Sequence, residues 1–257
     1  MPGKTNWTPF TRETPMDTPT LTTMVVLYTM GVKLNTDILV QELPLTESII
    51  KIEKQGVLKR GESKRDRIKR RNAEIVPKRT TGFGHNSITM VLMSSGVGLR
   101  EKEITIKIFQ NGVFHITGVL DETYDRDVTT RIRRHIETFC PHAIVSGEWT
   151  PNIRRVVLMN YKTRLSGVTN LSRETLHTNL RKQGTKSNYE PAVYPAVKIY
   201  FEDKKWIAKV FRTGNVILTG MVSADECDEL KIQLETLLVS GLGSCNGEHA
   251  QTSRAST

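Results

Sequence analysis

The sequence predicts an α+β protein built from two copies of one unit, each an antiparallel β-hairpin followed by an amphipathic helix. The hairpin IFQNGVFHITG at 108–118 returns as VFRTGNVILTG at 210–220, with the central Gly and the closing Thr-Gly in place. The offset of 102 residues continues into the helix that follows each hairpin, where the matched apolar positions are Val128, Ile132 and Ile136 with Leu230, Leu234 and Leu238. A register kept over about thirty residues indicates duplication, the first feature to seek in a sequence.

Length and composition limit the domain organisation, the class of partner and the compartment. A chain of 257 residues can form one large domain or two small halves that share a sheet. The net charge of +10 and pI of 9.6 favour an anionic partner, nucleic acid first, with a merely soluble basic surface as the alternative. The three cysteines have no C-x-x-C spacing, which is typical of a reducing compartment. No apolar run of about 18 residues and no signal pattern occur, so we expect a soluble intracellular protein without membrane contact.

The N-terminal part predicts a disordered tail at 1–18 and a first copy of the unit at 19–140. Prolines and threonines without periodicity fill the tail. From Thr22 the run TTMVVLYTM is apolar and β-branched, as in a strand. Asn35 or Thr36 can then cap a short helix that Pro44 limits.

A basic segment interrupts the first copy. Residues 54–79 hold eleven Lys or Arg against three acids. Such a run is usually a solvated, mobile face, and the functional alternative is a basic arm lying against phosphate or another acidic surface. The first strands of the two copies, VVLYTMGVKL and VVLMNYKTRL, are offset by about 131 residues instead of 102. We therefore predict an insertion of some thirty residues, at about 54–82.

The strands on either side of the first hairpin turn predict two distinct faces. Strands are expected at 87–93 and 103–109, and side chains alternate along a strand. Ile104, Ile106 and Ile108 then share a buried side with Phe114 and Ile116. The opposite side carries Thr105, Lys107, Phe109, Val113, His115 and Thr117. One side of the hairpin belongs to the core, and the other side is available for a different role.

The remaining elements follow from helical spacing and capping signals. A helix is expected at 124–139, ended by Cys140-Pro141. The second copy, at 150–240, predicts a strand at 154–160, a helix that begins at Ser172, strands at 197–200, 206–211 and 215–219, and a helix from Ser223, whose spacing to Glu226 is that of a capping box. A disordered tail is expected at 241–257.

Several of these motifs resemble, in order, the landmarks of the TATA-box-binding protein (TBP) family. They are PTLTTMVVLYTMGVKL, RNAEIVPKR with the strand after it, IFQNGVFHITG, NYEPAVYP and VFRTGNVILTG. The similarity covers about 19–238, and NYEP-x-x-YP and the paired hairpins are its most specific parts. Overall identity is low, so the chain resembles a divergent, TBP-like member of the kind carried by large DNA viruses.

The resemblance implies a saddle-shaped, curved antiparallel sheet made of two pseudo-symmetric repeats, with helices on the convex face and DNA under the concave face. It implies a general transcription initiation factor that binds and bends AT-rich promoter DNA through the minor groove. The implied partners are double-stranded DNA, a transcription factor IIB-like protein and the RNA polymerase machinery. The implied location is the nucleus, or the viral factory or virion of a virus.

The resemblance also assigns roles to single residues. The wedges that unstack bases would be Phe109 with Phe83 in the first copy and Phe211 with Tyr194 in the second. Thr117 and Thr219 would hydrogen-bond to base acceptors, and apolar contact with the groove floor would come from Val25, Val157 and Ile217. Glu190, in the loop with the YEP motif, would contact the IIB-like partner.

Some positions depart from the family pattern. Where the family places an Asn in the first strand of each half, this chain has Thr23 and, by the sequence alignment, Arg155. His115 replaces a small aliphatic residue, and Lys107 and Lys209 lie on the expected concave face. We expect a more electrostatic groove contact with altered sequence preference, since the minor groove separates A·T from G·C and little more.

No catalytic constellation stands out, so the sequence predicts neither an enzyme nor a cofactor. His135, Cys140 and His142 are close in the chain but lack a fourth ligand and the usual metal spacing. Two functions compete with the initiation factor. One is a protein-interaction adaptor that kept the saddle with weak or non-specific DNA binding. The other is a TBP-like module of a nucleic-acid enzyme, which would need a catalytic domain that this sequence lacks.

Overall fold

The computed structural model describes residues 16–71, 86–150 and 153–243. The chain forms two compact units. The N-terminal unit is Thr23–Val157, and the C-terminal unit is Leu158–Thr257 together with Met1–Thr22. The boundary therefore falls inside the first strand of each repeat, β1 (Thr20–Thr29) and β9 (Ile153–Arg164). Each unit is described by itself below.

The N-terminal unit is built on an antiparallel sheet in the order β1-β7-β6-β5-β3-β4. Its strands after β1 are β3 (Ile49–Lys54), β4 (Leu58–Gly61), β5 (Ser87–Ser94), β6 (Lys102–Phe109) and β7 (Val113–Val119). A separate two-stranded sheet pairs β2 (Val32–Leu34) with β8 (Ile144–Gly147), and a 3₁₀ turn at Pro141–Ala143 precedes β8.

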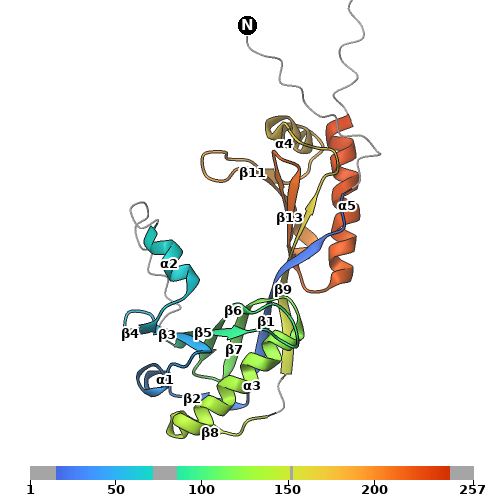
Figure 1. Ribbon diagram of the computed structural model, residues 1–257. Helices are drawn as coiled ribbons and strands as arrows, with labels where there is room; N and C mark the ends of the chain where they lie inside the picture. The colour runs from blue at the N-terminus through green and yellow to red at the C-terminus, as the bar shows by residue number, and fades with distance from the viewer. Residues whose placement is uncertain (1–15, 72–85, 151–152, 244–257) are drawn as a thin grey trace, which may run out of the picture. The chain divides into compact units, whose positions relative to one another are not determined.

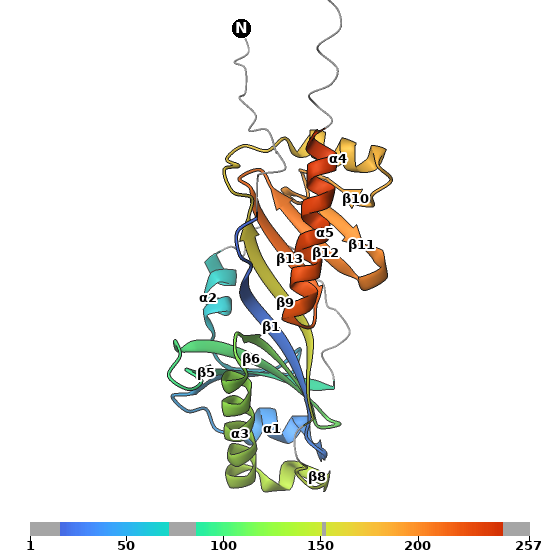
Figure 2. The same ribbon diagram turned by 90° about the vertical axis from the view of Figure 1, so that its right-hand side faces the viewer.

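Helices lie on both sides of this sheet. The helices α1 (Thr36–Glu42) and α3 (Glu122–Phe139) lie on one side, and α2 (Lys64–Arg71) lies on the other, as Figures 1 and 2 both show. The prediction that all helices share one face is therefore wrong for α2, which belongs to the basic insertion. The face opposite α1 and α3 is called the open face of the N-terminal unit.

The C-terminal unit is simpler. Its antiparallel order is β10-β11-β12-β13-β9, with β10 (Ser187–Asn188), β11 (Ala196–Phe201), β12 (Trp206–Phe211) and β13 (Asn215–Met221). A 3₁₀ turn at Glu202–Lys204 links β11 to β12. The helices α4 (Arg173–Lys182) and α5 (Ala224–Gly243) pack against one face, and the opposite face is the open face of this unit.

The alternation predicted for the hairpins is confirmed. Ile104, Ile106, Ile108, Phe114 and Ile116 are fully buried, together with the α3 stripe Val128, Ile132 and Ile136. The equivalent core of the C-terminal unit contains Val210, Val216, Leu218, Leu230, Leu234 and Leu238, all fully buried. Removal of this apolar surface from water is the main favourable term for each unit.

The helices begin where the sequence predicts caps. The side chain of Asn35 accepts hydrogen bonds from the amides of Asp37 and Ile38, and that of Ser172 accepts from the amide of Thr175. The Ser223 hydroxyl accepts from the amide of Glu226 at 3.2 Å, as the predicted capping box requires. Asp121 caps α3, which therefore begins two residues before the predicted start.

The two hairpins repeat in detail, but the first strands align differently from the sequence comparison. Val25 lies opposite Thr117 in β7, and Asn160 lies opposite Thr219 in β13. The amide of Met30 donates to the carbonyl of Gly112, as that of Leu165 does to Gly214. The structural offset is thus 135 residues, from 25 to 160, and the predicted 131 is wrong for these strands.

The predicted tail and insertion also differ from expectation where the structure describes them. At the end of the tail at 1–18, Met16 is buried in the core of the C-terminal unit. The amide of Asp17 donates to the carbonyl of Arg164 at 2.9 Å. The predicted C-terminal tail begins inside α5, which continues to Gly243. The basic segment forms β4 and α2, so this part is an ordered element instead of a solvated run.

Candidate nucleic-acid interface

The strand register defines the open face of the N-terminal unit. Thr117 lies between Val25 and Thr105, and His115 lies between Leu27 and Lys107. Phe109, at the end of β6, lies opposite Ser87. Directly opposed residues in an antiparallel pair share one face, so Thr117, His115, Lys107 and Phe109 lie together as the sequence predicts.

The open face of the C-terminal unit is more basic. Lys209 lies between Lys198 and Ile217, and Lys162 lies on the far side of Ile217. Thr219 lies between Ile207 and Asn160, and Arg164 lies opposite Asn215. None of the strand residues that the register places on this face is acidic. An uncompensated group of Lys and Arg attracts a polyanion.

An aromatic pair closes one end of this face. The ring of Phe211 is 6.0 Å from that of Tyr194, in an edge-to-face arrangement. The ammonium group of Lys198 lies 5.1 Å from the centre of the Tyr194 ring, within cation–π range. Both rings are half-buried, so part of each aromatic surface remains open. The structure thus brings Tyr194 and Phe211 together, as their shared predicted role requires.

The loop that carries Tyr194, residues 189–195, is held by α4. The guanidinium group of Arg173 donates to the carbonyl of Pro195 at 2.6 Å and lies 5.3 Å from the centre of the Tyr189 ring. The Tyr189 hydroxyl donates to Glu174 at 3.1 Å. The predicted partner residue Glu190 is exposed on this loop and accepts a hydrogen bond from the Asn188 amide at 2.9 Å.

The other predicted residues are distributed unevenly. Lys107 is exposed. The half-buried residues are Phe109, Thr117, His115, Thr23, Val157, Ile217, Thr219 and Lys209. Val25 is 7% exposed, so little of its surface is available to a ligand. Arg155 is exposed on β9. Phe83 lies outside the described residues.

The register corrects two of the repeat equivalences and reveals a residue that the sequence reasoning missed. The equivalent of Val25 is Asn160, not the Val156 that an offset of 131 gives, and the equivalent of Thr23 is Leu158, not Arg155. The Thr219 hydroxyl donates to the side-chain oxygen of Asn160. No signal in the sequence marks this position, because the similarity of the two valine-rich strands points to a different offset.

The environment of His115 favours its neutral form. Burial lowers the pKa of His115, and the nearby positive charge of Lys107 lowers it further. Protonation would place two cations side by side on the open face. A bound polyanion would reverse part of this effect.

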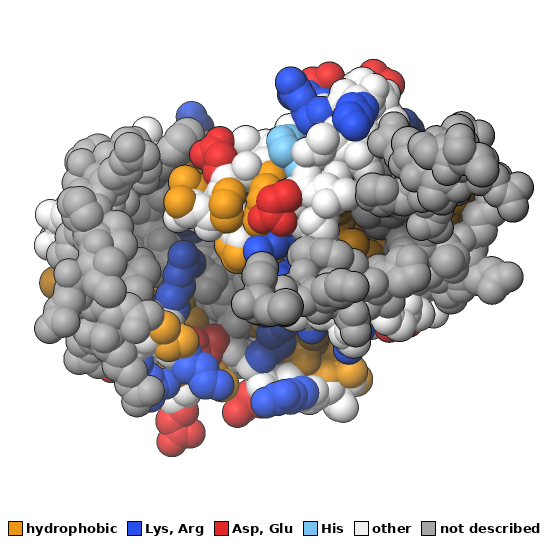
Figure 3. All heavy atoms as spheres, turned by 90° about the horizontal axis from the view of Figure 1, so that it is seen from above, with side chains coloured by type: hydrophobic (Ala, Val, Ile, Leu, Met, Phe, Trp, Pro, Cys, Tyr) orange, Lys and Arg blue, Asp and Glu red, His pale blue; other side chains and the backbone are white. Residues whose placement is uncertain are grey.

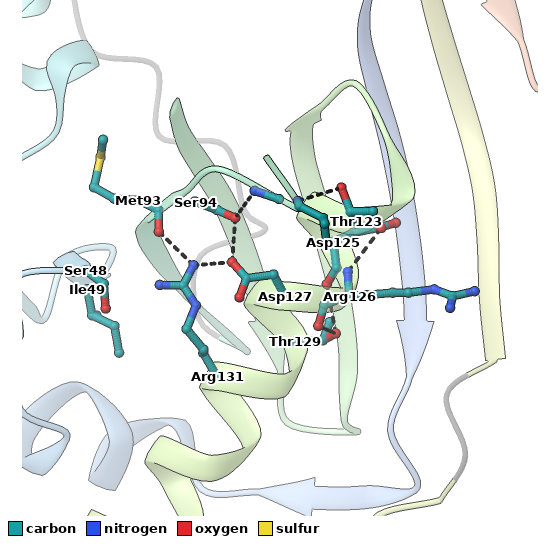
Figure 4. A network of polar contacts seen from close by, with 12 residues as sticks. Ser48, Ile49, Met93, Ser94, Thr123, Asp125, Arg126, Asp127, Thr129 and Arg131 are labelled. Atoms are coloured by element: carbon teal, nitrogen blue, oxygen red, sulfur yellow. Dashed lines mark hydrogen bonds and ion pairs between the residues drawn. The ribbon is translucent and has the colours of Figure 1, made fainter. Parts of the chain in front are cut away.

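The opposite side of the N-terminal sheet carries a separate polar cluster. Figure 4 shows Ser94 and Arg131 converging on the carboxylate of Asp127, each at 2.5 Å. Arg131 also donates to the carbonyl of Met93 at 2.7 Å. This cluster borders a cleft of about 360 Å³ that also includes Glu47 and Glu101. The network ties α3 to the end of β5.

A buried ion pair joins α3 to β9 within the same unit. The carboxylate of Asp125 is 0% exposed and accepts from the Arg154 guanidinium at 2.8 Å. Burial raises the pKa of Asp125, and the charge of Arg154 opposes that rise without cancelling it. Burial, assisted by the charge of Asp125, raises the pKa of Tyr28 to about 12.

The residues considered for metal or nucleophilic chemistry have other partners. His135 Nε2 lies 2.8 Å from the carbonyl of Pro44, and His142 Nε2 lies 2.8 Å from Glu42. Burial raises the pKa of Cys140, and that of Cys227 to about 11, so both thiols stay protonated. Within the described ranges, no group of three His, Cys, Asp or Glu residues could hold a metal ion. Nor is any described helix long and apolar enough to cross a membrane.

Charged side chains of both signs are visible on the side of the molecule drawn in Figure 3. Figure 3 shows Lys and Arg beside hydrophobic and acidic side chains, between the atoms drawn in grey. The basic groups on the two open faces are assigned by the strand register and not by this view. Their distinguishing feature is the company of aromatic and hydroxyl side chains.

Comparisons with known proteins agree with this geometry. Residues 169–237 match the family model described as transcription factor TFIID, or TATA-binding protein. The structure is similar to Methanococcus jannaschii TBP, with a TM-score of 0.55 and 16% identity over 86% of this chain and 98% of that chain. A Clostridium acetobutylicum aspartate kinase matches at a TM-score of 0.21 and 11% identity, over 95% of this chain and 38% of that one, too weak to carry an argument.

A search of curated proteins finds no significant match. The family model covers the core elements of the C-terminal unit from the start of α4 into α5. The archaeal structure extends the fold likeness to the N-terminal unit as well. Residues 169–237 therefore carry the sequence pattern of the TATA-binding protein family, and the chain has the TBP-like α+β fold.

Proposed function

We propose that the protein is a general transcription initiation factor that binds and bends AT-rich promoter DNA through the minor groove. Its family and fold suggest a DNA-binding transcription factor. The observation that carries the proposal is the open face of the C-terminal unit. There Lys162, Lys198 and Lys209 share one face with the Phe211–Tyr194 pair, and no opposed strand residue is acidic.

The chemistry of this face suits a minor groove. Lysines can neutralise phosphates along the groove edges and release counterions. Apolar and aromatic side chains can enter between bases and replace water at the groove floor. Thr219, Asn160 and Thr117 can bond to base acceptors, while Phe109 supplies the equivalent aromatic ring in the N-terminal unit.

The two repeats and their partners belong to the same proposal. We assign the repeats to 19–140, with the insertion at about 54–82, and to 150–240. Glu190, exposed on the loop that Arg173 holds, would contact a transcription factor IIB-like protein, which would bring the RNA polymerase machinery. The protein would act where its promoters are, in the nucleus or, for a viral protein, in the viral factory or virion.

One observation favours a second function, a TBP-like adaptor with weak or non-specific DNA binding. The helix α2 covers the outer part of the open face in the N-terminal unit, where Lys51 is only 6% exposed. A covered face has less area for a groove. In that case the exposed charges would hold an acidic protein partner.

Binding to an AT-rich and a GC-rich duplex across a salt series separates the two functions. A Phe109→Ala/Phe211→Ala variant is measured alongside, with a distance-dependent fluorescence probe of bending on each duplex. We expect the wild type to prefer and bend the AT-rich duplex. The variant should lose at least about thirtyfold in affinity for it, because base–aromatic stacking contributes about 1–3 kcal/mol per base and two rings are removed.

A matched control removes an aromatic ring elsewhere. Phe139 on α3 is 54% exposed and lies outside both open faces, so Phe139→Ala should bind and bend DNA as the wild type does. Equal binding to both duplexes, with a normal Phe109→Ala/Phe211→Ala variant and all affinity in a steep salt slope, would contradict the initiation-factor proposal and support the adaptor.

A further inference from the structure

The helix α2 is anchored to the open face by its acidic residue and its N-terminus. Asp66 accepts from Lys51 at 3.0 Å and forms an ion pair with Lys59 at 2.9 Å. The backbone amide of Lys64, in the first turn, donates to both oxygens of Glu103 on β6 at 3.0 Å. These contacts come from three strands, so α2 has one defined position on the sheet.

A local motif strengthens this anchor. Asp66 accepts from both the amide and the hydroxyl of Ser63, which is 4% exposed. Burial alone would raise the pKa of Asp66, but the hydrogen bonds from Ser63, Lys59 and Lys51 outweigh it and lower the pKa well below its usual range. The carboxylate is therefore ionised at neutral pH and fully engaged.

The anchor directs the remaining charges toward solvent. Lys64, Arg65 and Arg67 are exposed, and Arg67 keeps only a long contact of 4.0 Å with Glu103. The only acid on the helix, Asp66, faces the sheet. The exposed surface of α2 is therefore positive, and it lies on the same side of the sheet as Lys107 and Phe109.

The position of α2 in the topology is also informative. It lies in the connection from β3 to β5, and the loop carrying Tyr194 lies in the equivalent connection, from β10 to β11. In the C-terminal unit this connection presents an aromatic side chain beside Phe211. In the described part of the N-terminal unit it presents a basic helix instead.

We propose that α2 is a phosphate-binding element, whose exposed basic side chains contact the sugar-phosphate backbone of a DNA duplex on the open face. This inference rests on the proposed function and deepens it. The two units then hold DNA by different chemistry: the N-terminal unit mainly through backbone charge, and the C-terminal unit through aromatic and hydrogen-bonding contacts. Backbone contacts add affinity and fix register but do not read sequence.

A charge-removal variant of the full chain tests the proposal. Lys64→Gln/Arg65→Gln removes two positive charges from exposed side chains and leaves Ser63, Asp66 and the Lys64 amide in place. The logarithm of the affinity falls linearly with the logarithm of the salt concentration. Each lost phosphate contact should make this negative slope shallower by about 0.9. We expect a slope reduced by roughly 1–2, with affinity lowered equally on AT-rich and GC-rich duplexes.

The matched control removes the same charge from the other side of the sheet. Arg133→Gln/Arg134→Gln changes two exposed arginines of α3 and should leave the slope within error of the wild type. Hydrogen exchange provides a readout that does not depend on affinity. Amides of α2 should exchange more slowly in the DNA complex than in the free protein.

The outcomes are distinct. If the wild type binds neither duplex, the proposed function and this inference fail together. If the wild type binds DNA but the α2 variant keeps the wild-type slope, only this inference is overturned. If the α2 variant binds more tightly than the wild type, α2 competes with DNA as a cover, which also overturns it.

Discussion

The hydroxyl of Thr219 donates a hydrogen bond to the side-chain oxygen of Asn160, across the β13–β9 pair on the open face of the C-terminal unit. The equivalent pair in the N-terminal unit is Thr117 with Val25, which has no polar side chain. The repeats therefore differ at the position nearest the predicted base contacts. At this pair of positions a hydroxyl and an amide lie together in the C-terminal unit, and a hydroxyl and a valine in the N-terminal unit.

We predict that Asn160→Val lowers the preference for AT-rich over GC-rich DNA by about two- to tenfold, the equivalent of a net hydrogen bond of about 0.5–1.5 kcal/mol. The substitution makes this position like Val25. Competition binding with both duplexes measures the preference. Thr117→Val, which has no amide beside it, should change the preference less, and an unchanged preference in Asn160→Val would remove Asn160 from the proposed interface.

The buried pair of Asp125 and Arg154 should be important for stability. Arg154→Gln leaves an uncompensated carboxylate at a fully buried position, and we expect it to cost about 3–5 kcal/mol of unfolding free energy. Arg155→Gln, at the exposed neighbouring position, should change the free energy by less than about 0.5 kcal/mol. Urea unfolding at neutral pH measures both.

The same variant should respond to pH in a defined direction. Without Arg154 the pKa of Asp125 should rise further, because burial is then unopposed. Acidification protonates the buried carboxyl, so part of the lost stability should return as the pH falls. Equal unfolding free energies of Arg154→Gln and Arg155→Gln at neutral pH would show that the ion pair contributes little to stability.

A side chain at the hairpin glycine, position 112, should be destabilising. Gly112 has φ of +74°, and a Cβ there would lie 2.0 Å from the backbone oxygen of Val32. Gly56 has φ of +77° but nothing within 4 Å, so Gly56→Ala costs only the left-handed strain of about 1–2 kcal/mol. Gly112→Ala should cost roughly 1–3 kcal/mol more, because a backbone carbonyl must move. Thermal unfolding of both variants checks the difference.

His115 should make the N-terminal unit less stable at mildly acidic pH. Burial and Lys107 lower its pKa in the folded protein, whereas the unfolded chain titrates near about 6.5. The unfolded state therefore binds the proton more tightly, and stability should fall as the pH drops from about 6.5 through the lowered pKa. Below both pKa values of His115, its contribution to the free energy of unfolding no longer changes with pH.

Urea unfolding between neutral and mildly acidic pH measures this effect, with His115→Gln as the comparison. The difference in unfolding free energy between the two proteins should change across that pH range, because a glutamine side chain does not titrate. A constant difference would mean that His115 has the same pKa in the folded and unfolded states.

The sequence by itself determined the features that depend on residues close together in the chain. Alternation along β6 and β7 separated Ile106 from Lys107, and helical spacing found the α3 stripe, because burial follows the strand and helix periods directly. Short polar side chains marked the caps at Asn35 and Ser172, since a cap bonds amides only two or three residues away. The paired hairpins established the duplication.

Only the tertiary structure decided which residues from separate segments lie opposite one another. A strand register depends on hydrogen bonds between distant segments, so the equivalence of Asn160 with Val25 could not be derived from the similarity of two valine-rich strands. The docking of α2 depends on Lys51 and Glu103, which come from two different strands. A segment with eleven basic residues is expected to be solvated when those partners are not known. Met16 and Arg154 were missed for the same reason, because the partners that bury or pair them are distant in the chain.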